Sequence, residues 1–179
     1  MEKIKPSELT INFSTELFFD TNIWLFLFGQ LAGHKKDRQK EYSKLFEKAL
    51  QKKCPIFITS MIISEFANVI LRDEFKKWSR DSNKINLKYK DDFVGTEAYK
   101  EKVKAVKIQL NKILSLPNIV KQPDSFNSLS LENVLSDFGT ADFNDAYINE
   151  IVNNRNLILV TDDGDFEKIF TGKKLVTMS

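Results

Sequence analysis

Cysteine and histidine are nearly absent from this sequence, which contains one of each, Cys54 and His34. A single cysteine cannot form an internal disulfide bond, as expected of a protein in a reducing compartment. A single histidine leaves almost nothing for a Ser-His-Asp triad, a histidine pair or a His-rich zinc site. The sequence also lacks the patterns G-x-x-x-x-G-K-[ST], G-x-G-x-x-G and G-x-S-x-G. If the protein is an enzyme, its chemistry must come mainly from carboxylates.

Long hydrophobic runs and a strong net charge are absent as well. Apolar runs such as IWLFLF are far shorter than the ~20 residues that span a bilayer, and the amino-terminal MEKIKPSELT lacks the apolar core of a secretory signal. We therefore expect a cytoplasmic protein. The formal net charge is +2, so any basic surface for nucleic acid must be local. The 179 residues, 42% hydrophobic and 29% charged, suit one soluble globular domain over residues 1–179.

Three short apolar runs each lead directly into a helix-like segment. They are ELFFD at residues 16–20, CPIFIT at 54–59 and NLILV at 156–160. Runs that are near-continuous in Phe, Ile, Leu and Val are typical of strands buried on both faces. Strands interleaved with helices predict a parallel α/β sheet. KLVTM at 174–178 is a candidate edge strand.

Helical spacing predicts a helix over residues 34–53, between the first two of these runs. Its apolar face would consist of Tyr42, Leu45, Phe46 and Ala49.

The middle of the chain, roughly residues 73–137, has a different character. Its first part is charged, with dispersed aromatic residues, and residues 96–116 have amphipathic helical spacing. A break bracketed by Pro117 and Pro123 is followed by another short helical pattern at 128–139. We interpret this section as a helical insertion, or cap, on the α/β core.

Acidic side chains follow two of the predicted strands directly. Asp20 ends the first run, and Asp162, Asp163 and Asp165 follow the third. Ligand sites of open α/β sheets lie beyond the carboxyl ends of the strands, where these residues would meet. Local alternatives exist, because Asp20 is a good helix cap and TDDGD predicts a tight turn around Asp162 and Gly164. The turn does not account for all three carboxylates.

Two further carboxylates lie on predicted inward faces of helices. Glu65 lies in SMIISEFANVILR, a segment apolar nearly all round, where a lone glutamate is costly unless it is paired or bound to a ligand. The alternative for Glu65 is an ion pair, with Arg72 as the candidate partner. Asp145 shares the inward stripe of TADFNDAYINEIVNN, whereas Asp142, one turn earlier, also suits the electrostatics of a helix amino terminus.

Asp20, Glu65, Asp145 and Asp163 are therefore the carboxylates that local structure explains least. Clustered together they would repel one another and stay protonated unless a cation joined them. Oxygen ligands without histidine or cysteine favour Mg²⁺ or Mn²⁺. Such ions activate water and stabilise the attacking and leaving oxygens in phosphodiester hydrolysis.

In combination, three segments resemble the PIN domain family, the ribonuclease fold of bacterial VapC-type toxins and related nucleases. LFFDTNIW resembles the family's opening hhhDTN, and ITSMIISEFANVI resembles its strand followed by a helix with a central glutamate. DFNDAYINEIVNNRNLILVTDDGDF resembles its D-A-x-I helix and its L-V-T-x-D-x-D-F close. The resemblance covers roughly residues 17–29, 55–72 and 138–167. It implies a Rossmann-like α/β/α sandwich with a central, mainly parallel sheet.

The resemblance also implies roles for individual residues. The catalytic metal ligands would be Asp20, Glu65, Asp145 and Asp163. Asn22 and Thr161 would support the site through hydrogen bonds. Asp165 would bind or orient a second metal ion, and Asp142 would be an accessory acid. The number of ions stays open, and so does the choice between Asp163 and Asp165 as the direct ligand.

A ribonuclease also needs a surface for phosphates. Basic residues interleaved with an aromatic ring suit single-stranded RNA, and they occur together at Lys76, Lys77, Trp78, Arg80 and Lys88. Nearby acidic residues dilute this charge, so a solvated helix face is the slightly favoured interpretation. PIN-like toxins usually form homodimers and are neutralised by a cognate antitoxin, and the resemblance implies both partners here.

We therefore expect a Mg²⁺- or Mn²⁺-dependent endoribonuclease, the toxin component of a type II toxin–antitoxin system. There are two alternatives. A haloacid-dehalogenase-like phosphohydrolase would need an aspartate where Asn22 stands and a lysine shortly before TDDGD, and the sequence has neither. A PIN-like module that binds RNA or protein without cutting would have no need to retain a cation-binding set of carboxylates.

Overall fold

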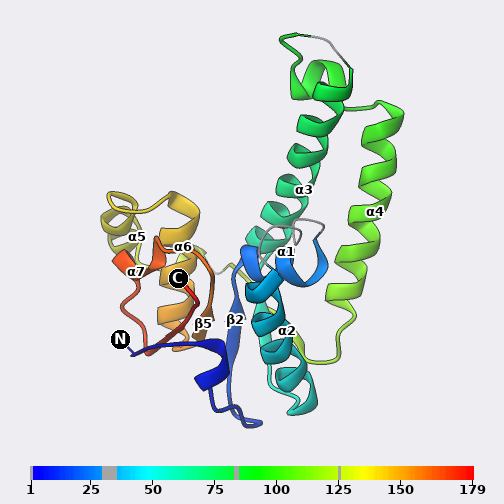
Figure 1. The fold of residues 1–179 in the computed structure, drawn as a ribbon. Helices are drawn as coiled ribbons and strands as arrows, with labels where there is room; N and C mark the ends of the chain where they lie inside the picture. The colour runs from blue at the N-terminus through cyan, green and yellow to red at the C-terminus, as the bar shows by residue number, and fades with distance from the viewer. Residues whose placement is uncertain (1, 30–35, 83–84, 125) are drawn as a thin grey trace.

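The sheet of this protein consists of six parallel strands. The computed structural model describes residues 2–29, 36–82, 85–124 and 126–179 (Figure 1). The strands are β1 Glu2–Ile4, β2 Leu17–Phe19, β3 Ile56–Ile58, β4 Ile119–Lys121, β5 Ile158–Val160 and β6 Lys174–Val176. Their order across the sheet is β1-β6-β5-β2-β3-β4, and every neighbouring pair is parallel. The predicted parallel α/β fold is therefore confirmed.

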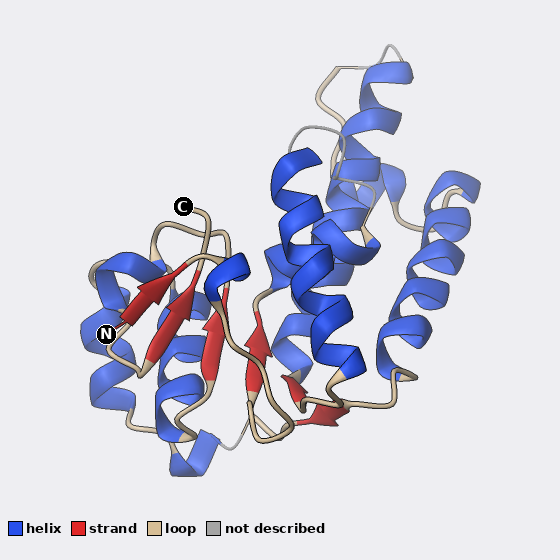
Figure 2. Cartoon of the chain, turned by 60° about the horizontal axis from the view of Figure 1, so that its bottom comes forward, coloured by secondary structure: helices blue, strands red, loops and turns tan. Residues whose placement is uncertain are grey.

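Helices lie on both sides of this sheet (Figure 2). The α-helices are α1 Thr21–Phe28, α2 Lys36–Gln51, α3 Ser60–Asp81, α4 Glu97–Leu114, α5 Leu131–Phe138, α6 Phe143–Asn154 and α7 Phe166–Ile169. Short 3₁₀ segments occur at Pro6–Glu8 and Phe126–Ser128, and a π-helical turn occurs at Tyr89–Phe93. α5, α6 and α7 lie together on one side of β2 and β5, and α1 to α4 lie on the other (Figure 1). No helix in the described ranges is long and apolar enough to cross a membrane.

The central strand is covered on both faces, as its continuous apolar sequence predicts. Every residue of β2 is buried, and Leu17 aligns with Ile56 of β3 on one side and with Ile158 of β5 on the other. Trp24 of α1 packs against Phe19, with their ring centroids 5.5 Å apart, and its indole N–H donates to the Phe19 carbonyl oxygen at 3.0 Å. These contacts fix α1 directly behind the end of β2, and with it the residues of the DTN motif.

The outer strands carry no sequence signal that predicts them. β1 and β4 are each three residues long and mostly exposed, so neither has an apolar pattern. β6, predicted as an edge strand, is instead an inner strand, because β1 pairs with its free side. The predicted helix over residues 34–53 is α2, whose buried residues are Tyr42, Leu45, Phe46 and Ala49. His34, at the start of that prediction, lies outside the described residues.

The middle section, residues 73–137, contributes helices and also one strand. α3 and α4 pack against each other as a long hairpin that projects well beyond the sheet (Figure 1). After α4 the chain returns to the sheet and forms β4, which pairs with β3. Residues 73–137 are therefore mostly helical, but they also complete one edge of the sheet.

An aromatic cluster closes the far end of the α3–α4 hairpin. Phe93 is fully buried there, and its ring centroid lies 5.4 to 5.7 Å from those of Phe75, Trp78, Tyr89 and Tyr99. We call these five residues the tip cluster. They form a small apolar core of their own, separate from the residues that cover the sheet.

Phe93→Ala should open the tip of the hairpin without unfolding the sheet. Loss of a fully buried phenylalanine ring costs about 3–5 kcal/mol, and here that cost falls on the tip cluster. Hydrogen exchange measured by mass spectrometry should accelerate across residues 75–99, whereas the amides of β2 and β5 should keep their protection.

Phe18→Ala is the matched control, because Phe18 is fully buried in β2. This change should accelerate exchange across the whole protein. If Phe93→Ala exposed the β2 amides to the same degree, the tip cluster would not be an independent core.

Candidate metal centre

Four of the predicted site residues lie at the carboxyl end of the sheet. Asp20 directly follows β2, Asp163 follows β5, and Glu65 lies in α3, the helix that follows β3. Asp145 lies in the first turn of α6, the helix that leads into β5. Because β5, β2 and β3 are adjacent parallel strands, their carboxyl ends open onto the same edge of the sheet. The topology therefore brings together residues that are far apart in the sequence.

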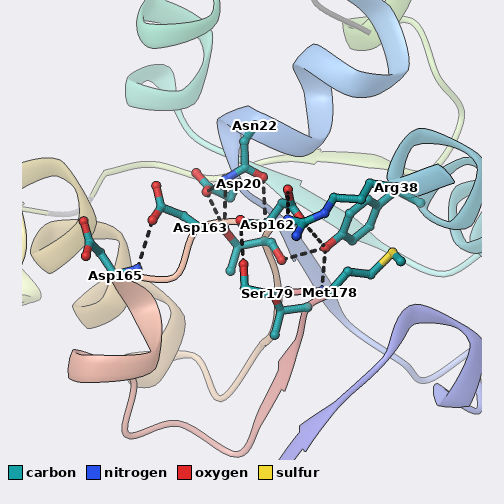
Figure 3. A network of polar contacts seen from close by, with 11 residues as sticks. Asp20, Asn22, Arg38, Asp162, Asp163, Asp165, Met178 and Ser179 are labelled. Atoms are coloured by element: carbon teal, nitrogen blue, oxygen red, sulfur yellow. Dashed lines mark hydrogen bonds and ion pairs between the residues drawn. The ribbon is translucent and has the colours of Figure 1, made fainter. Parts of the chain in front are cut away.

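Asp20 is held by several donors at once. Its side chain is nearly fully buried, at 5% exposure, and its Oδ1 accepts from the Thr21 backbone N–H at 2.6 Å. Its Oδ2 accepts from the Asn22 side-chain amide and from the Thr161 hydroxyl, the latter at 2.7 Å (Figure 3). Asp20 also caps α1, as the alternative interpretation of this residue as a helix cap predicted. The cap leaves the burial of the charge unexplained.

Asn22 and Thr161 join the ends of β2 and β5. The Asn22 amide donates to Thr161 Oγ1 at 3.0 Å, and Asn22 Oδ1 accepts from the Asp162 backbone N–H at 3.0 Å. Thr161 Oγ1 also accepts from the Asp163 backbone N–H at 3.0 Å. These bonds fix the Asp20 carboxylate and the turn that carries Asp163 relative to each other.

Glu65 is half-buried and is held by a hydroxyl. Thr21 Oγ1 donates to Glu65 Oε2 at 2.8 Å. The predicted alternative, an ion pair with Arg72, does not occur between these two residues, both of which the structure describes. The Arg72 guanidinium lies instead 5.4 Å from the centroid of the Tyr89 ring. Thr21 was missing from the predicted site, although the DTN sequence that contains it was the available signal.

Asp142 and Asp145 occupy the amino terminus of α6. Asp142 is exposed and caps the helix, because its Oδ1 accepts from the Asp145 backbone N–H at 2.9 Å. Asp145 is partly buried in the first turn. The helix therefore accounts for Asp142 locally, whereas the Asp145 side chain has no such capping role.

The carboxylates perturb one another's protonation. Burial raises the pKa of Asp20 to about 7, against the hydrogen bond from Thr161, and the charges of Glu65 and Asp163 raise it further. Burial raises the pKa of Asp145 to about 8, and the charges of Asp142, Asp20, Asp163 and Glu65 act in the same direction. The pKa of Glu65 is also raised, by burial and then by Asp142 and Asp163. Burial and nearby negative charge therefore both favour the protonated form of these three carboxyl groups.

The donor set fits a hard divalent cation. Across the described ranges, no group of three or more His, Cys, Asp or Glu side chains is arranged to hold a metal ion directly. The acidic side chains at this end of the sheet nevertheless offer carboxylate oxygens, the ligands that Mg²⁺ and Mn²⁺ prefer. A cation among them would replace the protons that the raised pKa values of Asp20 and Asp145 retain.

Asp162 has a different role from its neighbours. Its side chain is 1% exposed, Arg38 of α2 forms an ion pair with its Oδ2 at 2.7 Å, and the Tyr42 hydroxyl donates to its Oδ1 at 3.1 Å. The carboxyl terminus adds two bonds, because the Met178 N–H donates to the Tyr42 oxygen at 3.0 Å and the Ser179 hydroxyl donates to the Asp162 carbonyl at 2.8 Å (Figure 3). Asp162 therefore anchors the turn after β5 to α2 and to the chain end.

Asp163 and Asp165 face different partners. Asp163 Oδ1 accepts from the Asp165 backbone N–H at 2.9 Å, which closes the turn predicted around Gly164. Asp165 Oδ1 forms an ion pair with Lys168 of α7 at 2.6 Å. Asp163, by contrast, contributes to the raised pKa of Asp20, Glu65 and Asp145.

The predicted RNA-binding residues lie near the far end of α3 or beyond it, away from the carboxylates (Figure 1). Lys77 forms an ion pair with Asp73 at 2.7 Å. Trp78 is part of the tip cluster, with its ring centroid 5.4 Å from that of Phe93. Lys76, Arg80 and Lys88 are exposed. The aromatic residue of this set therefore serves packing between helices.

Comparisons with known proteins bear on the fold and the family. A family model described as PIN domain matches residues 17–170. A chain of VapBC2 from Rickettsia felis, in a crystal structure bound to a DNA fragment from their promoter, superposes with a TM-score of 0.52 at 16% identity, covering 91% of this chain and 98% of that one. PAE2754 from Pyrobaculum aerophilum gives a TM-score of 0.48 at 15% identity, covering 90% and 84%. No curated protein matches. At these identities the VapBC2 likeness concerns the fold alone.

Arg38→Ala should destabilise the protein by about 3 kcal/mol, because the buried Asp162 carboxylate then loses the ion pair with Arg38. Adding Asp162→Asn to Arg38→Ala should recover much of this loss, since the buried charge is then gone. Urea unfolding of the parent, the single variants and the double variant measures the coupling between the two side chains.

Lys168→Ala is the control for an exposed ion pair, and it should leave the unfolding midpoint unchanged. Equal losses in Arg38→Ala and in the double variant would show that the charge of the buried Asp162 is not the cause.

Proposed function

The chain belongs to the PIN domain family, whose members are generally nucleases, and we propose that it is a Mg²⁺- or Mn²⁺-dependent endoribonuclease. One observation carries this proposal: carboxylates from four parts of the chain lie at the end of β2, β3 and β5, where burial and neighbouring negative charges raise the pKa of Asp20, Glu65 and Asp145. A cluster of this kind is unfavourable without a cation, and cations held by carboxylates suit phosphodiester hydrolysis.

In this proposal Asp20, Glu65, Asp145 and Asp163 would hold the divalent ion. When bound, such an ion supplies activation of water and stabilisation of the attacking and leaving oxygens. The chain's own contribution is to fix the ligands. Asn22 and Thr161 orient the Asp20 carboxylate, and Thr21 orients that of Glu65.

The choice between Asp163 and Asp165 follows from their surroundings. We assign Asp163 as the direct ligand because it acts electrostatically on the other three carboxylates. We assign Asp165 a supporting role, because it donates its N–H to Asp163 and pairs its carboxylate with Lys168. Asp142 would act as an accessory acid from the amino terminus of α6.

The biological role that fits best is the toxin of a type II toxin–antitoxin pair in the cytoplasm. The similarity in fold to a chain of the VapBC2 complex supports this role. Exposed apolar residues around α5 and the start of α6 would offer a surface for a cognate antitoxin or a second copy of the chain. These residues are Phe126, Leu131, Leu135, Phe138 and Phe143. Apolar patches of this kind commonly mark protein–protein contacts.

We further treat residues 1–179 as a single PIN-like domain. Residues 73–137 would be its helical insertion, with β4 as the part of that section that returns to the sheet. The haloacid-dehalogenase-like alternative has no support, because Asn22 stands where a second aspartate would be needed and donates to Asp20 instead.

The parent protein should cleave RNA in the presence of Mg²⁺ or Mn²⁺, and addition of EDTA should abolish the cleavage. Asp20→Asn and Glu65→Gln should each lower the rate by at least about a hundredfold, because each removes a negatively charged ligand. Gel analysis of a panel of structured and single-stranded RNAs measures these rates.

Glu132→Gln provides the control, since Glu132 is an exposed carboxylate of α5 outside the site, and this variant should cut at the parent rate. Parent-like activity of both site variants would move the active site elsewhere. A parent that binds Mn²⁺ and RNA but cuts no RNA would indicate the non-cleaving binding module.

A further inference from the structure

An open groove of about 570 Å³ borders the carboxylates and runs along α3. One wall consists of residues of α3, and the other of residues near α6. The lining residues are Ser60, Met61, Ser64, Glu65, Asn68, Val69, Arg72, Asp124 and Asn144. Glu65, a proposed metal ligand, is therefore also part of the groove. We call this feature the α3 groove.

Three polar residues of α3 follow one another along the α3 groove. Glu65, Asn68 and Arg72 are separated by three and four residues, which places them on one face of the helix. At 1.5 Å of rise per residue, Arg72 lies about 10 Å beyond Glu65 along the helix axis. The groove therefore leads from the carboxylates to a positive charge farther along α3.

Arg72 is exposed, and it is the one cationic residue among those that line the α3 groove. Its guanidinium lies 5.4 Å from the centroid of the Tyr89 ring, which belongs to the tip cluster. A cation–π contact of this kind restricts the side chain while leaving N–H donors available. Arg72 is thus both accessible and oriented.

The opposite wall offers groups that suit a nucleotide. Asn144 is exposed in the first turn of α6, next to Asp145, and its amide can donate and accept. Phe143 precedes Asn144 in the chain but does not line the groove; it is 40% exposed and stacks on Tyr147 with ring centroids 6.0 Å apart. Single-stranded nucleic acid is typically bound by cationic groups along its backbone and by aromatic rings that stack on its bases.

Resting on the proposed nuclease function, we propose that the α3 groove binds single-stranded RNA beside the scissile bond, with Arg72 on a neighbouring backbone phosphate. An arginine matches phosphate through paired N–H donors, and phosphate contacts position a strand without reading its sequence. Among the RNA-binding residues predicted from the sequence, Lys77 is paired with Asp73 and Trp78 is packed in the tip cluster. The exposed Lys76, Arg80 and Lys88 lie outside the lining of the α3 groove.

The test is RNA binding in the Asp20→Asn background, which should bind RNA without cutting it. The probe is a short, random-sequence, single-stranded RNA labelled with fluorescein, followed by anisotropy in Mg²⁺ between about 50 and 200 mM KCl. Arg72→Ala should weaken binding about fivefold near 0.1 M salt and reduce the slope of log K against log salt by about 0.7, the effect of one lost phosphate contact. Arg72→Lys should keep the slope.

Arg155→Ala is the matched control, because Arg155 is an exposed arginine that also lies over an aromatic ring, that of Phe57, but outside the α3 groove, and it should change neither quantity. Arg72→Gln is made alongside, so that a folding defect in one variant does not decide the result, and circular dichroism checks all of them. The proposal is overturned if neither neutral variant weakens binding, if Arg72→Lys weakens it as much as Arg72→Ala, or if Arg155→Ala weakens it more than Arg72→Ala.

Cleavage by the parent decides the nuclease function separately. If the parent cuts RNA but its RNA binding does not depend on Arg72, the nuclease function is supported and the proposed RNA-binding role of the α3 groove is overturned. A parent that does not cut RNA although binding depends on Arg72 would overturn the nuclease function and keep the α3 groove as an RNA-binding surface.

Discussion

Burial of several neighbouring carboxylates at the end of β2, β3 and β5 is the constraint on which the rest of the structure depends. Asp20 is nearly fully buried beside Glu65 and Asp163, and Asp145 adds to the same group, so that the pKa of Asp20 is about 7 and that of Asp145 about 8. Burial of several acids in one place is unfavourable for folding unless a cation offsets their charge. The cluster therefore has a cost in the metal-free chain and a use in a chain that binds a divalent ion.

The surrounding structure holds these acids in place. The buried strands fix the starting points of α1, α3 and the turn after β5, and the hydrogen bonds of Thr21, Asn22 and Thr161 then orient the individual carboxylates. The Arg38–Asp162 ion pair secures the same turn to α2, a helix that contributes no ligand itself. α3 connects the carboxylates to the α3 groove and to the tip cluster. A metal centre requires this kind of support for a defined geometry, from rigid secondary structure and from hydrogen bonds that orient the ligand side chains.

The sequence predicted the parts of the fold with strong local patterns. The strands β2, β3 and β5 are continuous apolar runs, and α2 has a regular apolar face, so all four could be recognised. β1 and β4 could not, because their pairing depends on backbone contacts with distant strands. Glu65 and Asp145 stood out as acids on inward helix faces, whereas Arg38 and Asp162 are 124 residues apart and carry no mutual signal. Trp78 looked like a stacking ring for RNA, but the tip cluster that packs around it forms only in the folded hairpin.

The most direct test of this account is a calorimetric titration of the metal-free protein with Mn²⁺ at about pH 7, in two buffers with different enthalpies of ionisation. Because burial and mutual repulsion keep protons on Asp20 and Asp145, binding should release about one proton or more per ion, and the heat should differ between the buffers accordingly. Asp145→Asn should remove most of that difference. Absence of Mn²⁺ binding, or binding with the same heat in both buffers, would contradict a cation centre built from these carboxylates.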